Sequence, residues 1–116
     1  MRPDDSVYLR HILDAIERVA VYLVGVDEER FWDEQMVQDA VIRQIEIIGE
    51  ASRHVSDETR ARAPKVPWLD MAGMRNKLIH DYFGVDIGTV WLTATGDLPQ
   101  LAPDIERLIR EPDRPG

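Results

Sequence analysis

The sequence predicts an all-α protein, and three observations support this. Apolar residues recur at the three- and four-residue spacing of amphipathic helices, no useful stretch alternates as a strand would, and glycines and prolines separate the helical segments. The chain has 116 residues, of which 44% are hydrophobic, enough for one core. We therefore expect a single-domain bundle of about five helices.

The first expected helix covers about residues 6–24, after a capping acid or serine at residues 4–6. Its apolar residues fall on one arc: Tyr8, Leu9, Ile12, Leu13, Ile16, Val19, Ala20 and Leu23. Gly25 and three acids then mark a break, and Phe31 and Trp32 are expected to anchor the connection.

A second, longer helix is expected over about residues 33–55. Its apolar positions spread over half of the helix circumference, which is more than one partner helix requires. We expect it either to pack on two neighbours or to form part of a dimer interface. Gln44 lies within the apolar arc, as a hydrogen-bonded core residue or, alternatively, a site-facing one.

The remaining elements are shorter. They are a brief helix from Ser56 limited by Pro64 and Pro67, a main helix over residues 68–79, a segment that Asp86 caps, and a last helix over residues 101–109. Residues 96–99, Gly-Asp-Leu-Pro, are expected to interrupt the last two. We assign residues 1–110 to one domain and expect 111–116 to form a flexible tail.

Composition and charge exclude several classes of protein. The absence of cysteine removes disulfide scaffolds and thiol chemistry, and no apolar run is long enough for a membrane span, so we expect a cytoplasmic protein. The net charge of −8 disfavours general nucleic-acid binding. Residues 53–77 carry a net charge of +3. This segment forms either a local patch that faces phosphate or a solvated charged turn.

The most informative stretch is residues 74–83. On a helix, Asn76 and His80 share a face, and Arg75 and Tyr82 lie on nearly one stripe. Arg75 is about 140° from His80 around the axis, so only its length or a partner chain brings the two together. The imidazole of histidine can transfer protons near neutral pH, and the guanidinium of arginine can bind a phosphate through two N–H groups. The amide of asparagine can orient a neighbouring group by hydrogen bonds, and the phenol of tyrosine can accept a transferred group. From the spacing alone, the alternative to a catalytic role is that each of these residues is structural or simply exposed to solvent.

His11 and His54 are weaker candidates. His11 lies outside the apolar arc of its helix, and His54 lies at an edge. The three histidines of the chain are far apart in sequence, so a histidine-built metal site is not expected.

At this point the sequence resembles a known family. Arg75-Asn76 followed by His80-Asp81-Tyr82 resembles the RNxxxHxY form of the Rx4–6H motif of HEPN domains. The flanking segments resemble the HepT-like (DUF86) group in order and spacing over nearly the whole chain: Ile48-Gly49-Glu50-Ala51, Val85-Asp86, Val90-Trp91, and Leu98-Pro99-Gln100-Leu101 with Ile105.

The resemblance implies a homodimeric helical bundle that acts as the toxin of a type VII toxin–antitoxin pair. In that family the motif is a metal-independent endoribonuclease without cofactor, and two motifs face each other across the dimer. Arg75 and His80 would be catalytic and Asn76 supporting, with Lys77 and Arg53 as further candidates for contact with RNA. The usual partner, a minimal nucleotidyltransferase of the MntA type, would neutralise the toxin by transferring AMP to Tyr82.

Elementary chemistry is consistent with this expectation. RNA cleavage by its own 2′-OH needs a base, an acid and positive charge at the phosphorane. One histidine cannot be base and acid at once, but His80 from each of two protomers could. The alternative is a non-catalytic module that docks the transferase, which the acidic charge modestly favours. For Tyr82 the alternative is a packing role.

Overall fold

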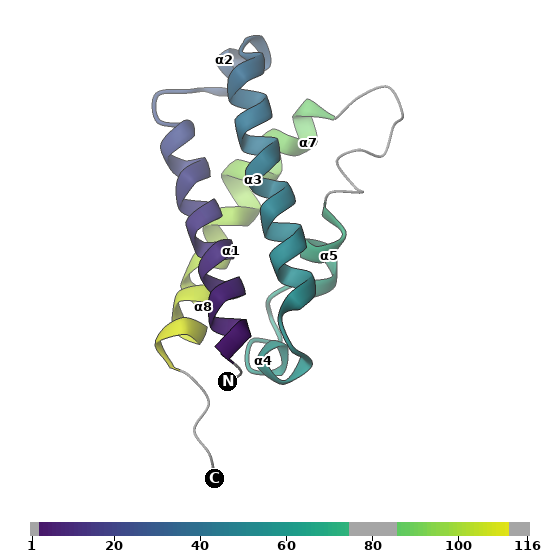
Figure 1. Cartoon of the computed structure of the whole chain (residues 1–116). Coiled ribbons are helices and arrows are strands. Elements are labelled where there is room, and N and C mark those ends of the chain that lie inside the picture. The colour runs from purple at the N-terminus through teal and green to yellow at the C-terminus, as the bar shows by residue number, and fades with distance from the viewer. Residues whose placement is uncertain (1–2, 75–85, 112–116) are drawn as a thin grey trace.

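The computed structural model describes residues 3–74 and 86–111, and within these ranges it contains helices and no strand (Figure 1). The helices are α1 Pro3–Tyr22, α2 Glu28–Asp33, α3 Gln35–His54, α4 Asp57–Ala61, α5 Trp68–Ala72, α7 Ile87–Leu92, the π-helix η1 Thr93–Asp97 and α8 Leu98–Arg110. The all-α prediction is confirmed. None of the helices in these ranges combines the length and apolarity needed to cross a membrane.

The core lies between the three long helices, because α1 packs along both α3 and α8 (Figure 1). Its fully buried side chains come from all three: Leu9, Ile12, Val19, Val41, Ile45, Ile48, Leu98, Ile105 and Leu108. Helix α3 also contacts α2, α5 and α7, which confirms that its broad apolar arc serves more than one neighbour. Gln44 lies within this arc and is 6% exposed, as expected of a core position.

The connection between α1 and α3 differs from the expectation at one residue. Gly25 turns the chain with φ of 72°, and α2 follows with its N-terminus capped by the Asp27 carboxylate. Phe31 is fully buried and packs on Trp91 with ring centroids 5.3 Å apart, so its anchoring role is confirmed. Trp32 is not an anchor in the core, because successive residues of a helix point about 100° apart and Trp32 is 52% exposed.

The expected interruption at residues 96–99 is also wrong. Helices α7, η1 and α8 form one continuous helical path, widened at η1 where the Leu98 N–H donates to the Thr93 carbonyl five residues back. Pro99 sits in the first turn of α8 and has no N–H to donate. A single wider turn accommodates the proline without ending the helix.

The expected helix over residues 68–79 is helical in its described part. Helix α5 runs from Trp68 to Ala72 and ends at Gly73, whose N–H donates to the Leu69 carbonyl. The Trp68 indole N–H donates to the Ala63 carbonyl at 3.1 Å, which ties the helix to the preceding loop. Residues 75–79 lie outside the described residues.

A buried carboxylate joins the start of α1 to the start of α4. Asp5 is 1% exposed and accepts hydrogen bonds from the Ser56 N–H at 2.9 Å, the Ser56 hydroxyl at 2.6 Å and the Thr59 hydroxyl at 2.7 Å. The Ser56 hydroxyl in turn accepts from the Thr59 N–H and caps α4. This network fixes the turn after α3 against the beginning of the chain.

We expect Asp5→Ala to lower the free energy of unfolding by about 2–3 kcal/mol, because its donors would be left buried without an acceptor. Chemical denaturation followed by circular dichroism measures the change. Asp14→Ala, at an exposed position of the same helix, is the control and should change stability by about 0.5 kcal/mol or less. Equal effects of the two substitutions would contradict the proposed role of Asp5.

Candidate functional site

The segment that carries the predicted motif lies between α5 and α7. Most of the predicted site residues lie outside the described residues: Arg75, Asn76, Lys77, His80 and Tyr82. The structure does describe the helices on both sides of the segment, and both of them pack on α3. The structure therefore shows how α5 and α7, the helices on either side of the segment, are held.

The end of α5 is held against α3 by an unusually close approach. A Cβ atom added to Gly49 would lie 3.1 Å from the Met71 carbonyl oxygen and 3.6 Å from that of Ala72. The Arg53 Nε–H, one turn further along α3, donates to the Ala72 carbonyl at 3.4 Å. The missing side chain thus admits the last carbonyls of α5, and an arginine satisfies one of them. This contact fixes the chain just before the motif.

Arg53 is the one predicted RNA-contacting residue that the structure describes. Its side chain is exposed and borders two hollows, a cleft of about 130 Å³ beside α5 and an open groove of about 610 Å³ along residues 53–58. Within the described part of the chain, its two terminal amino groups make no hydrogen bond. They are free to bind an anion beside the start of the motif.

The other described bases of the 53–77 segment have different surroundings, although Arg60 lines the open groove together with Arg53. Arg60 donates to the Ser52 carbonyl at 2.7 Å and to the Val55 carbonyl at 3.1 Å, and so covers the C-terminal end of α3. Arg62 donates to the Glu111 carbonyl, and Lys65 faces α8. The hypothesis of one basic patch is therefore wrong for Arg62 and Lys65, because the fold directs them elsewhere.

The chain after the motif is held by α2. The Asp86 carboxylate accepts the Thr89 N–H at 3.1 Å and caps α7. A Cβ atom on Gly88 would lie 3.7 Å from the Trp32 ring, so the indole packs over the first turn of α7. The sequence indicated Trp32 only as an anchor of the connection between the first two long helices, and the contact of its indole with α7 was not expected.

The other two histidines lie together on the surface, away from any enclosed cavity. Both are exposed, as expected, and both contact Tyr8: His54 stacks on the phenol ring with centroids 4.7 Å apart, and His11 meets its edge at 6.1 Å. His54 Nε2 also lies 3.3 Å from a Glu50 carboxylate oxygen. Among the described residues, no three histidine, aspartate or glutamate side chains converge as a metal-binding group.

We expect Gly49→Ala to lower the free energy of unfolding by about 1–2 kcal/mol, because the added methyl group meets backbone oxygen that cannot move without displacing α5. Gly96→Ala is the matched control, since a Cβ atom there meets nothing within 4 Å. The control should be neutral or stabilising by up to about 1 kcal/mol. Urea denaturation of both variants decides, and an equally tolerated Gly49→Ala would contradict the close-approach interpretation.

Comparison with known proteins identifies the family. The family model described as "Ribonuclease HepT-like" matches residues 12–108. A protein of Thermococcus cleftensis named "Probable ribonuclease HepT" is 41% identical over 108 residues, 93% of this chain and 98% of its own. An inferred RNase of Methanocaldococcus jannaschii is 39% identical over 89% of this chain and 94% of its own length.

A second M. jannaschii relative, whose name joins gamma-glutamylcyclotransferase and an inferred RNase, is 42% identical over 98% of this chain. The chain spans about half of that relative, 51% of its length. No solved structure matches. The family match and the relatives together confirm the resemblance drawn from the motif and its flanks: the chain belongs to the HepT-like ribonuclease family.

Proposed function

We propose that this ribonuclease is a metal-independent endoribonuclease toxin that acts in the cytoplasm as a homodimer. The observation that carries the proposal is the complete Arg75/His80 motif in a chain that the HepT-like model matches over residues 12–108. The packing of α5 and α7 on α3 supports it, because a catalytic segment needs fixed ends to hold its side chains in register.

In the proposed reaction, the ribose 2′-OH attacks the adjacent phosphorus and the 5′-oxygen leaves. The imidazole of His80 from one protomer takes the proton of the 2′-OH, and His80 of the other protomer protonates the leaving oxygen. Arg75 holds the phosphate and stabilises the charge that develops on the phosphorane, and Asn76 orients the imidazole or the phosphate. The products are a 2′,3′-cyclic phosphate and a free 5′-hydroxyl.

Substrate binding must overcome the net charge of −8. Arg53 supports binding at this site, because its free amino groups lie beside the contact that fixes the start of the motif segment. Lys77 would add a second phosphate contact from within that segment. A few well-placed cations are enough for a site that grips one or two phosphates.

We further propose that a cognate MntA-like nucleotidyltransferase neutralises the toxin by transferring AMP to Tyr82. The phenol oxygen would replace the leaving pyrophosphate on the α-phosphorus of ATP. The added nucleotide brings bulk and a negative charge next to the pocket that receives RNA phosphate. Both effects oppose substrate binding.

A non-catalytic adaptor that only docks the transferase is the second candidate. The acidic charge favours it, and so does the structural use of Arg60 and Arg62, which leaves fewer bases for RNA. The intact Arg75/His80 pair disfavours it, because an adaptor has no evident need for a titrating group at this position.

We expect the purified chain to cleave RNA in the presence of EDTA and to leave cyclic-phosphate ends. His80→Ala should lower the rate at least about 100-fold, because the base and the acid are both lost from the dimer. His11→Ala removes an exposed histidine elsewhere and should keep full activity. Gel analysis of a labelled RNA measures the rates, and intact RNA or equal cleavage by both variants would favour the adaptor.

We expect co-expression with the neighbouring nucleotidyltransferase to add AMP to the chain and to abolish cleavage. Tyr82→Phe should prevent the addition, because it lacks the accepting oxygen, and should remain toxic. Tyr22→Phe is the control and should be modified like the unaltered chain. Intact-mass and peptide mass spectrometry report the modification, and a modified Tyr82→Phe variant would exclude Tyr82 as the acceptor.

A further inference from the structure

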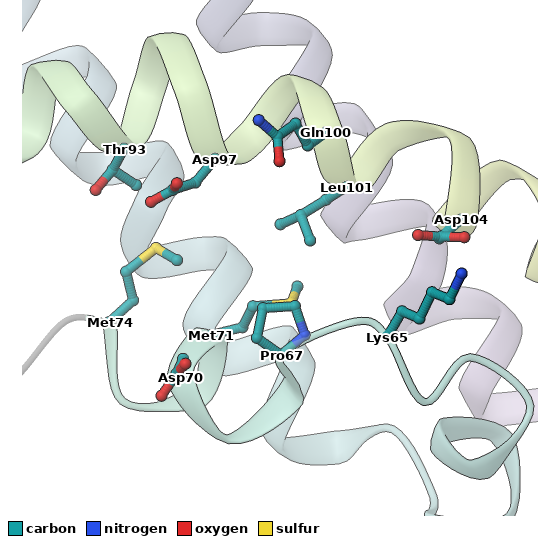
Figure 2. A pocket seen from close by; sticks show the side chains of 10 residues that line it. All are labelled: Lys65, Pro67, Asp70, Met71, Met74, Thr93, Asp97, Gln100, Leu101 and Asp104. Atoms are coloured by element: carbon teal, nitrogen blue, oxygen red, sulfur yellow. The ribbon is translucent and has the colours of Figure 1, made fainter.

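A further cavity lies between α5 on one side and η1 and α8 on the other. It has a volume of about 460 Å³, within the range of small-ligand sites. Figure 2 shows two facing rows of side chains, one from η1 and α8 and one from α5 and the chain before it. Its lining residues are Lys65, Pro67, Asp70, Met71, Met74, Thr93, Asp97, Gln100, Leu101 and Asp104. It shares Met71 and Met74 with the segment that leads into the motif.

The floor of the cavity is apolar and its rim is acidic. Met71, Met74 and Leu101 are each less than 10% exposed and supply thioether and methyl groups. The rim carries three carboxylates against one lysine, and Asp104 is paired with Arg107 at 3.7 Å. Asp70 and Asp97 make no ion pair with any residue that the structure describes. The cavity therefore presents uncompensated negative charge above a hydrophobic floor.

A threonine without a hydrogen-bond partner in the cavity wall is a second, independent feature of this site. Thr93 is 6% exposed and lines the cavity, and its hydroxyl has no hydrogen-bond partner within residues 3–74 and 86–111. Its neighbour Thr95 instead satisfies its hydroxyl on the Trp91 carbonyl at 2.7 Å. Because Thr93 lines the cavity, its hydroxyl is available to accept a hydrogen bond from a donor group bound there.

We propose that this cavity binds an organic cation in which an ammonium or guanidinium group is carried on an aliphatic stem. The carboxylates of Asp70 and Asp97 and the hydroxyl of Thr93 would accept its N–H groups. The methylene stem would lie on Met71, Met74 and Leu101. Phosphate and RNA are excluded by like charge, so the cavity is distinct in its chemistry from the proposed nuclease site.

Calorimetric titration with agmatine, which carries both cationic groups on a four-carbon stem, tests the proposal on the purified chain. We expect agmatine to bind, 1,4-butanediol not to bind, and the affinity for agmatine to fall with added salt. The double variant Asp70→Asn, Asp97→Asn should weaken binding at least about tenfold, and Thr93→Val at least about threefold. Asp39→Asn, an exposed aspartate on α3, is the control and should bind as the unaltered chain does.

The cation is either a free polyamine or a lysine or arginine side chain of a bound protein. A second arm of the experiment distinguishes these two sources. The same variants are tested for affinity to the neighbouring nucleotidyltransferase. This arm rests on the proposed function, whereas the agmatine titration does not. Loss of agmatine binding in the double variant alone identifies a free cation as the source, and loss of complex affinity alone identifies a protein side chain.

Two results overturn the proposal. One is that neither agmatine nor the transferase distinguishes the double variant from Asp39→Asn. The other is that agmatine binds all variants equally, which would indicate adventitious binding to an acidic surface. Thermal unfolding by circular dichroism accompanies each titration, so that a folding defect in the double variant is recognised. In that case Thr93→Val, which removes only a hydroxyl, decides.

Discussion

The contact between the last carbonyls of α5 and Gly49 of α3 is the constraint on which the candidate site depends. A helix of five residues has little stability of its own, because nucleation costs more than so few hydrogen bonds return. Its position must therefore come from tertiary contacts, and the absent side chain at residue 49 lets its backbone approach to van der Waals distance. Arg53 then supplies a donor for the Ala72 carbonyl, which the end of the helix leaves unsatisfied.

Helix α3 consequently has two functions on two faces. Its inner face, with Val41, Ile45 and Ile48, fills the core against α1. A neighbouring face carries Gly49 and Arg53 to the end of α5, the helix that precedes the motif segment. A rigid, buried helix positions functional groups better than a loop does, because its own side chains are locked by packing. The apolar arc of α3 is broad in the sequence because the helix packs on more than one neighbour.

The sequence predicted the long elements well, because burial of one apolar stripe leaves a periodic signal. It failed where the determinant is not periodic. Trp32 follows the buried Phe31 directly, and hydrophobicity alone does not say which of two adjacent aromatic residues faces inward. At residues 96–99 the usual breakers Gly and Pro suggested an end, but a π-turn absorbs the proline. The proposed catalytic motif rests on residue type and spacing, whereas the support of α5 by Gly49 and Arg53 is a property of packing between distant segments.

The acidic composition of the chain limits how it can bind RNA. Arg60 and Arg62 donate to backbone carbonyls, so these two bases are less available to bind phosphate. An acidic surface weakens non-specific attachment to RNA, which depends on phosphate contacts over a wide area. It does not weaken a small site to the same extent, because salt screens charges beyond about 8 Å. In the proposed dimer, two copies of Arg53, Arg75 and Lys77 would meet around one substrate. The positive charge near the reacting phosphate would then be twice that of one protomer. The acidic remainder of each protomer would repel RNA. Such an enzyme would bind its substrate only through the site that the two protomers form together.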